Sequence, residues 1–326
     1  MSWAERQLPD ADEVFVDHVG YFVHDLAAAG AQLERLGFRV SAVNVQTNAD
    51  ASGALKPSGT SNRLAKLRFG FLEMLAATHD TPLAEQFRQQ IARYSGLHLI
   101  AFSAADMRRE RARLVDAGFA MQAVVELKRR DRTLAGEPEV HFSVLRPRPG
   151  VMAEGRIQWV RPNTPETVWR LETITTENGA EGLTDTLICV DDPAAVAARY
   201  GRYAGRAPIV RGGMHVVLLE RGGLVFVDSS QAAALLPDLR APSPPFMAGQ
   251  ALHADLAVTR ALLAKNGIKP VAGSNDLILI APSDALGAYL LFHAPDVNDP
   301  WGACSAPPPG HPATAADSQE SSVVLP

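Results

Sequence analysis

Residues 25–38 read DLAAAGAQLERLGF, and the chain repeats this pattern twice more. The further copies are 106–119 (DMRRERARLVDAGF) and 255–268 (DLAVTRALLAKNGI). In each copy the glycine follows the aspartate by 12 residues, and a leucine stands four residues before the glycine. A weaker copy runs from Asp192 to Gly205, a spacing of 13 residues. A spacing that recurs along the chain indicates repeated structural modules.

Each copy is predicted to form a short amphipathic helix. Aspartate is a favourable N-cap because its carboxylate accepts hydrogen bonds from the free amides of the first helical turn. Leu26, Ala29 and Leu33 recur at intervals of three and four residues, so they would form one buried face. Gly37 is expected to end the first helix in a left-handed conformation, which residues with a Cβ resist.

A strand-like run precedes each of these helices, and two or three strand candidates follow it. The preceding runs are 14–23, 96–102, 184–190 and 245–253. The candidates that follow are 38–45, 64–76, 119–127, 140–146, 156–160, 215–220, 223–228, 277–282 and 289–292. A connecting helix is expected over 82–94, and a long loop that could act as a lid over 47–59. The predicted order of elements in each module is therefore βαβββ.

One such module leaves a face of its sheet uncovered, so the modules are expected to pair into half-barrels. The predicted fold is α+β, with four βαβββ modules forming two half-barrel domains over 1–175 and 176–300. Residues 301–326 are rich in Pro, Ala and Ser and are predicted to be a disordered tail.

Composition narrows the classes of function. The 326 residues are 47% hydrophobic and carry a formal net charge of −5, so nothing favours binding to a nucleic-acid backbone. The only cysteines, Cys189 and Cys304, exclude a disulfide scaffold and a thiolate zinc site and are consistent with the cytoplasm. No apolar run is long enough for a membrane helix. Walker, GxGxxG, GxSxG and HExxH motifs are absent.

The repeat and several local stretches together resemble the vicinal oxygen chelate superfamily, and within it the glyoxalase-like group. The stretches are 16–20 (VDHVG), 59–64 (GTSNRL), 71–75 (FLEML), 158–161 (QWVR), 164–169 (TPETVW) and 178–180 (NGA). The resemblance covers about residues 14–293. This superfamily includes glyoxalases, methylmalonyl-CoA epimerases, extradiol dioxygenases and drug-sequestering resistance proteins, and it implies paired modules that are closed around a cleft.

The resemblance also implies a divalent metal, Zn, Mn, Ni or Fe, that is held by the first and last strands of two paired modules. His18 matches the first ligand position and Glu73 the second. His98 and Gln158 stand near the remaining two positions, in the second module. Glu73 is in addition the candidate catalytic residue, as a proton shuttle.

The second module departs from this pattern. His18 lies seven residues before Asp25, whereas His98 lies eight before Asp106. Strand alternation would turn His98 away from the cleft, and a β-bulge would turn it back, so both orientations stay open. The amide of Gln158 can bind a metal weakly but cannot act as a general base at neutral pH.

In the second half, the residues seven positions before Asp192 and Asp255 are Asp185 and Ala248, which do not repeat the histidine of the first module. The last strands of its two modules, within 223–228 and 289–292, contain no glutamate. This half is therefore expected to be a degenerate structural copy. An extradiol dioxygenase would have its ligands in the C-terminal pair, so the pattern argues against a plain ring-cleaving enzyme.

Asn62 and Arg63, which follow the predicted loop, are candidates for substrate contact, with Arg63 pairing with a carboxylate or phosphate. The alternative is that Asn62 caps the entry of the strand and Arg63 is solvated.

The sequence thus predicts a metal-dependent glyoxalase-like enzyme, a lyase, isomerase or oxygenase, that acts on a small oxygenated organic molecule. The alternative is a metal-free protein of the same fold that binds or sequesters a small molecule. Either function requires a small-molecule partner, involves neither nucleic acid nor membrane, and leaves a homodimer open.

Overall fold

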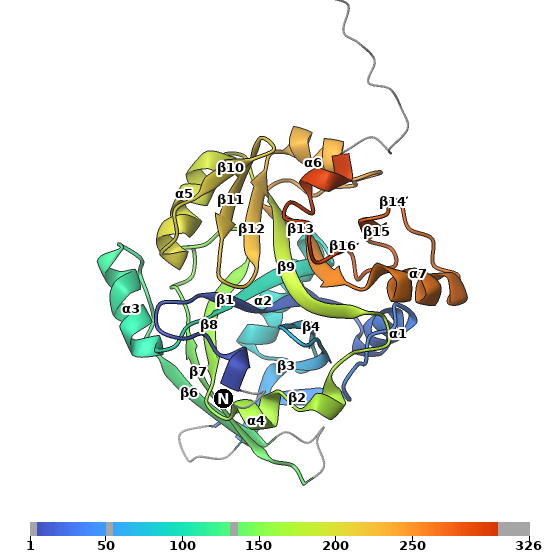
Figure 1. The fold of residues 1–326 in the computed structure, drawn as a ribbon. Coiled ribbons are helices and arrows are strands. Elements are labelled where there is room, and N and C mark those ends of the chain that lie inside the picture. Colours follow the sequence, from blue (N-terminus) through green and yellow to red (C-terminus); the bar gives the residue numbers. More distant parts are fainter. Residues whose placement is uncertain (1–4, 50–54, 131–135, 306–326) are drawn as a thin grey trace, which may run out of the picture.

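The computed structural model describes residues 5–49, 55–130 and 136–305, which form two eight-stranded sheets with flanking helices (Figure 1). Sheet A has the strand order β2-β3-β4-β1-β5-β8-β7-β6, and sheet B the order β10-β11-β12-β9-β13-β16-β15-β14. The strands of sheet A are β1 (Phe15–Phe22), β2 (Asn44–Ala49), β3 (Leu55–Lys66), β4 (Phe71–Ala77), β5 (Gly96–Ser103), β6 (Val125–Arg130), β7 (Glu139–Leu145) and β8 (Arg156–Pro162). Those of sheet B are β9 (Ala180–Cys189), β10 (Ile209–Arg211), β11 (Met214–Leu218), β12 (Gly223–Val227), β13 (Phe246–Ala254), β14 (Ala272–Gly273), β15 (Leu277–Ile280) and β16 (Tyr289–His293).

The helices either belong to the modules or connect them. Those within the modules are α1 (Leu26–Arg35), α3 (Met107–Asp116), α5 (Pro193–Ala204) and α7 (Leu256–Lys265). The others are α2 (Pro82–Arg93), α4 (Pro165–Val168), α6 (Ser229–Leu235) and the 3-10 turns η1 (Glu5–Gln7), η2 (Leu171–Thr173) and η3 (Gly302–Ser305). No helix of the described residues is long and apolar enough to cross a membrane.

The predicted α+β fold with four βαβββ modules is confirmed. In every module the first strand pairs in parallel with the last, as β1 does with β4. The first strands of two modules pair antiparallel at the centre of each sheet, β1 with β5 and β9 with β13. Each sheet therefore contains two modules, and sheet A forms a half-barrel.

The local signals in the repeat have the predicted effect. A carboxylate oxygen accepts two backbone N–H groups of the first helical turn at each of the N-caps Asp25, Asp106 and Asp255. The repeat glycines have positive φ, at 78° for Gly37, 89° for Gly118 and 67° for Gly267. This is the left-handed region that favours glycine.

Three local expectations need correction. Strands β2 and β3 extend into the predicted loop 47–59, of which residues 50–54 lie outside the described part of the chain. The predicted strand 64–76 is the end of β3 and most of β4, which are separated by a turn in which Gly70 has a φ of 83°. Trp301 is fully buried and is followed by η3, so the first residues of the predicted tail belong to the fold; residues 306–326 lie outside the described part.

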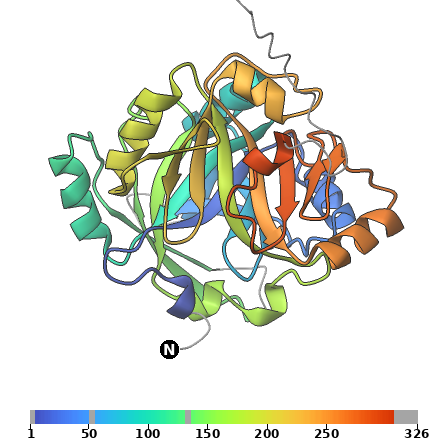
Figure 2. The ribbon, with the colours of Figure 1, turned by 45° about the horizontal axis from the view of Figure 1, so that its top comes forward.

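The two halves share one core. The outer faces of both sheets and the module helices contribute to a single cluster that includes Val19, Trp159, Ile188 and Leu252. Helix α1 lies beside α7 and α3 beside α5, as Figures 1 and 2 show. The side-chain amide of Asn266 donates to the carbonyl of Arg35 at 2.7 Å across the first of these contacts. The opposite face of each sheet, here called its inner face, is free of this core.

The inner faces of the two sheets are covered differently. Helix α2 places Phe87 and Ile91 on the inner face of sheet A, and α4 with Trp169 covers another part of it. On sheet B, helix α6 and Trp301 pack into one apolar cluster with the inner-face side chains. Polar side chains gather on the inner face of sheet A, so that face holds the candidate site.

Candidate functional site

His18 and Glu73 project from the same face of sheet A. The register pairs His18 of β1 with Phe71 of β4, and Gly20 with Glu73. Because alternate residues of a strand share a face, His18 and Glu73 both lie on the inner face. The intervening Val19 contributes to the shared core on the other side. The first and last strands of the first module thus bring the two predicted residues together.

The two side chains face each other closely. Nε2 of His18 lies 3.6 Å from Oε2 of Glu73. The exposed fraction is 6% for His18 and 7% for Glu73, so little water surrounds them. The imidazole is stacked on the ring of Phe71, with the ring centroids 4.3 Å apart. An acid and an imidazole with an aromatic neighbour can share a proton or bind a cation between them.

A second partner orients each of these groups. Nδ1 of His18 donates to Oδ1 of Asp17 at 2.6 Å, which leaves the lone pair of the neutral imidazole on Nε2. The side-chain amide of Asn62 donates to Oε1 of Glu73 at 2.6 Å, and Asn44 in turn donates to Asn62 at 3.1 Å. The structure therefore places Asn62 as a partner of Glu73, with 2% of its surface exposed.

Arg221, from the loop between β11 and β12, joins the second half of the chain to this site. Burial lowers the pKa of Arg221 to about 10, and the negative charge of Asp17 opposes that shift. The carbonyl of Arg221 accepts a hydrogen bond from the amide of Val16 at 2.8 Å. Asp17 is itself buried, and its Oδ2 has no hydrogen-bond partner among the described residues. The guanidinium of Arg221 itself donates to the carbonyl of Gln7 and stacks on the ring of Phe15 at 4.1 Å, before and at the start of β1.

Gln158 lies in the same cross-strand row as His18. Ala101 of β5 pairs with His18 on one side and with Gln158 of β8 on the other. The side chain of Gln158 is buried, and its Oε1 accepts a hydrogen bond from Nε of Arg146 at 3.1 Å. The structure therefore brings Gln158 to the inner face, where its amide oxygen holds an arginine.

His98 is not beside the His18–Glu73 pair. The register of β1 against β5 shifts at this residue, from Gly20 opposite Leu99 to Tyr21 opposite Leu97, so β5 contains the irregularity that could turn His98. Its ring stacks on Tyr94 at 3.9 Å and on Phe22 at 5.0 Å. Nε2 of His98 contacts the carbonyl oxygen of Tyr94 at 2.7 Å. His98 therefore packs against Tyr94, the residue that ends helix α2.

Arg63 lies next to Asn62 on β3 and therefore points to the outer side of the sheet. Its Nε donates to the carbonyl of Ser41 at 2.7 Å, and its terminal nitrogen pairs with Glu34 of α1 at 3.1 Å. The structure does not bring Arg63 to the inner face, because helix α1 and the loop before β2 supply its partners.

The residues present give two ligands of the kinds that divalent metals prefer. Two atoms bound to one tetrahedral metal at roughly 2.0–2.1 Å lie roughly 3.3 Å apart, close to the observed His18–Glu73 separation. The Asp17 carboxylate behind His18 is the outer partner that ligating histidines commonly have. Within the described residues, no three His, Cys, Asp or Glu side chains are arranged to hold a metal. A third protein ligand would therefore be an amide such as that of Gln158.

The corresponding part of sheet B is filled. The indole of Trp301 donates to the carbonyl of Asp185 at 3.1 Å, at the strand position that matches His18. Burial raises the pKa of Asp185 to about 6; Arg211 opposes the shift and Asp299 adds to it. Trp301 packs in one cluster with Leu187, Val225 and Ala251, so apolar side chains occupy this face.

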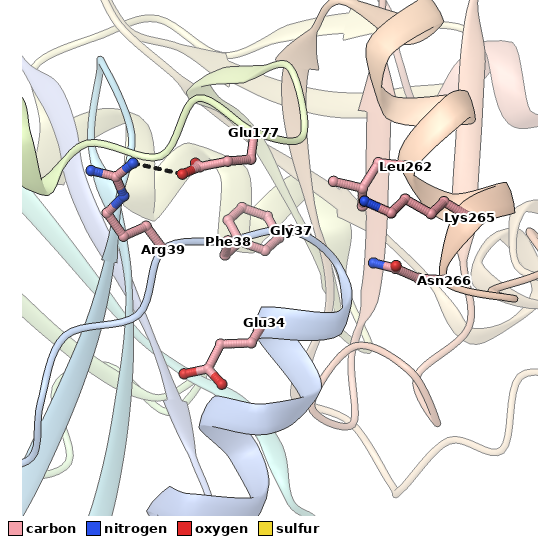
Figure 3. A pocket seen from close by; sticks show the side chains of 8 residues that line it. All are labelled: Glu34, Gly37, Phe38, Arg39, Glu177, Leu262, Lys265 and Asn266. Carbon is pink, nitrogen blue, oxygen red and sulfur yellow. Dashed lines mark hydrogen bonds and ion pairs between the residues drawn. The ribbon is translucent and has the colours of Figure 1, made fainter.

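A surface hollow of about 270 Å³ lies between the ends of α1 and α7 (Figure 3). It is lined by Glu34, Gly37, Phe38, Arg39, Glu177, Leu262, Lys265 and Asn266. Arg39 and Glu177 pair with each other at 2.6 Å on one side of it. None of the residues predicted for the site lines this hollow, which belongs to the contact between the two halves.

Sequence reasoning missed two inner-face residues, Arg146 and Arg156. Arg156 stands two positions before Gln158 and therefore shares its face. Arg146 continues β7, whose register pairs Leu145 with Trp159. The alternation of apolar and polar residues in 156–162 was the available signal for Arg156. Arg146 could be found only from the pairing of β7 with β8.

The paired-module fold is that of the vicinal oxygen chelate proteins. The model of the glyoxalase-like domain family matches residues 16–204, which is more than half of the chain. The chain therefore belongs to the glyoxalase-like domain family. No curated protein sequence matches it significantly.

Solved structures agree on the fold. A hypothetical protein from Staphylococcus aureus has a TM-score of 0.60 at 9% identity and covers 86% of this chain and 99% of its own. A triple mutant of 4-hydroxymandelate synthase from Streptomyces coelicolor has a TM-score of 0.55 at 14% identity, and the match covers 90% of this chain and 96% of the synthase chain. A fusion of a xylose isomerase-like TIM barrel with 4-hydroxyphenylpyruvate dioxygenase has a TM-score of 0.50 at 12% identity, and the match covers 89% of this chain and 50% of the fusion protein. At these identities the likeness is one of architecture.

Proposed function

We propose that the inner face of sheet A is the active site of a metal-dependent glyoxalase-like enzyme that acts on a small oxygenated organic molecule. The observation that carries this proposal is the 3.6 Å approach of His18 Nε2 to Glu73 Oε2, with Asp17 on the other imidazole nitrogen. The chemistry is of the lyase, isomerase or oxygenase type.

His18 and Glu73 would hold the metal, with the Gln158 amide and water completing the ligand set. A divalent metal supplies Lewis acidity, which stabilises an enolate-like or oxyanionic state of a bound substrate. Glu73 would double as the proton shuttle where its bond to the metal is labile: Asn62 holds Oε1, so Oε2 is the oxygen that would take and return the proton. Asp17 keeps the imidazole of His18 in one tautomer and orientation.

The test is elemental analysis of the purified full-length protein after incubation with Zn²⁺, Mn²⁺, Ni²⁺ or Fe²⁺ and removal of excess metal. We expect about one equivalent in the wild type and a loss of at least roughly tenfold in His18→Ala and Glu73→Gln. Asp185→Asn, the matched change on sheet B, should retain the wild-type metal content. Equal metal loss in all three variants, or none in His18→Ala, would place the metal elsewhere.

A metal-free binding protein is the second candidate, and one observation favours it. The Gln158 oxygen that could complete a ligand set already accepts a hydrogen bond from Arg146. Mass spectrometry of the small molecules that copurify with the protein separates the two functions. An unchanged stoichiometric ligand on metal-free protein supports sequestration, whereas turnover that requires added metal supports the enzyme.

A further inference from the structure

Two arginines lie on the inner face of sheet A beside the proposed metal site, and one of them, Arg146, donates to Gln158. Successive strand pairings place four residues side by side across the sheet: Arg156 of β8, Leu99 of β5, Gly20 of β1 and Glu73 of β4. Arg156 and Glu73 therefore occupy one cross-strand row. Arg146 lies one row further along, beside Gln158. The chain therefore places two guanidinium groups on the face that carries the His18–Glu73 pair.

These two cations occupy adjacent cross-strand rows on one face of the sheet. Among the described residues neither guanidinium has a carboxylate within ion-pair distance: Arg146 donates to the neutral Gln158, and Arg156 lies 5.7 Å from the ring of Phe87.

Two other arginines of similar intermediate exposure are each paired with an acid. Arg113 pairs with Glu110 at 2.5 Å, and Arg199 pairs with the buried Glu154. Bringing two like charges together away from water is costly unless an opposite charge is present. A pair of guanidiniums is also well suited to hold a carboxylate through parallel hydrogen bonds. The missing anion is therefore best supplied by a ligand.

Apolar side chains surround this position. Phe22, Leu75, Phe87 and Leu99 belong to one cluster on the inner face, and the ring of Phe87 is the neighbour of Arg156. Such surroundings exclude water from a charged contact and accept the hydrocarbon part of an organic ligand. The combination favours a small organic anion over an inorganic one.

We infer that the substrate or ligand of this face is an organic acid whose carboxylate is bound by Arg146 and Arg156, with Gln158 positioning Arg146. This inference rests on the proposed function in using the same face and in sharing Gln158 with the proposed ligand set, whereas neither arginine contacts His18 or Glu73 directly. Gln158 then acts as a positioning residue, through the hydrogen bond from Arg146 to its Oε1.

The experiment compares two probes of nearly equal shape, benzoate and the neutral benzamide, by calorimetric titration of full-length protein in EDTA. The wild type should bind benzoate at least tenfold more tightly than benzamide. Arg156→Gln and Arg146→Gln should each weaken benzoate binding at least tenfold and leave benzamide binding unchanged. Gln158→Leu should weaken benzoate binding by a smaller factor, and Arg156→Lys should recover part of the affinity that Arg156→Gln loses. Arg148→Gln, an exposed neighbour on the same hairpin, should match the wild type.

Equal affinity for benzoate and benzamide in the wild type, or an equal loss in Arg148→Gln, would overturn the inference. Binding of inorganic phosphate in place of benzoate would also overturn it, in favour of a site for inorganic anions. The outcomes of this experiment can be distinguished from those of the metal test. Arg156-dependent benzoate binding in a protein that takes up no metal would retain the acid site and reject the metal enzyme, whereas metal uptake without discrimination between the probes would do the reverse.

Discussion

Nε2 of His18 and Oε2 of Glu73 lie 3.6 Å apart, although they come from opposite ends of one module. The parallel pairing of β1 with β4 creates this proximity, because it aligns His18 with Phe71 and Gly20 with Glu73. Neighbouring strands lie about 4.7–4.9 Å apart, so side chains on adjacent strands and one face can meet directly. The module itself thus builds the acid–imidazole pair.

Asp17→Asn should weaken metal binding by roughly 10- to 100-fold, the range typical for loss of the outer partner of a ligating histidine. An asparagine can retain the 2.6 Å contact with Nδ1, but it removes the negative charge that fixes the proton there. Calorimetric metal titration measures this effect, with Asp185→Asn as the control. An affinity equal to that of the wild type would show that Asp17 does not position His18 for a metal.

Gly37→Ala should destabilise the protein more than Gly267→Ala, although both glycines end repeat helices with positive φ. The left-handed conformation alone costs an added Cβ about 1–2 kcal/mol, which both variants incur. At Gly37 the Cβ would also lie 2.5 Å from Leu262 and 2.9 Å from Asn178, whereas at Gly267 nothing lies within 4 Å. Overpacking of this kind adds about 1–3 kcal/mol.

Urea unfolding of the two glycine variants side by side measures the difference. Asn178 is fully buried and donates to the carbonyl of Leu36 at 3.0 Å, so the strain in Gly37→Ala falls on the joint between the halves. Equal losses of stability in the two variants would mean that this joint adapts to the added methyl group.

The repeat was predictable because its signals are local. An aspartate N-cap and a left-handed glycine act within one helix, and their spacing identifies the modules without knowledge of partners. The approach of His18 to Glu73 was expected from the resemblance of the first module. Both predictions depend on a single module, in which the strand order largely determines which residues lie side by side.

Features that depend on pairing between modules were not predictable in the same way. One irregular position in β5 decides where His98 points, and no residue type marks it in the sequence. Arg63 and Asn62 are neighbours in the chain, yet they face opposite sides of β3 because of the alternation of strand side chains. Arg146 reaches the inner face only through the register of β7 on β8.

Trp301→Ala should lower the free energy of unfolding by about 3–5 kcal/mol, the range for truncating a large buried aromatic residue. Trp301 has no exposed surface, contacts the inner-face cluster of sheet B and donates a hydrogen bond to the carbonyl of Asp185. Denaturant unfolding measures the loss. Leu171→Ala, at a site that is 66% exposed, should change stability by no more than about 0.5 kcal/mol. A Trp301→Ala loss of that small size would contradict the packing of residues 301–305 onto sheet B.

His98 gives a prediction on the pH dependence of stability. Burial lowers its pKa to about 4; the contact with the Tyr94 carbonyl opposes that shift and the charge of Arg93 adds to it. The unfolded chain has the ordinary histidine pKa of about 6.5. Between pH about 6.5 and 4 the unfolded state therefore binds a proton that the folded state does not. Stability from this residue is fully present above pH about 6.5 and is lost as the pH falls towards 4.

Comparison of the wild type with His98→Phe isolates this contribution. Phenylalanine can keep the stacking on Tyr94 and Phe22 but cannot titrate. The stability difference between the two proteins should be constant from pH 7 to 8 and shift by about 3 kcal/mol in favour of the variant on lowering the pH to 4. Urea unfolding across this range measures the shift, and the NMR titration of the imidazole gives the folded-state pKa directly. A folded-state midpoint near 6.5, with parallel stability curves for the two proteins, would contradict the buried, neutral His98 that the structure shows.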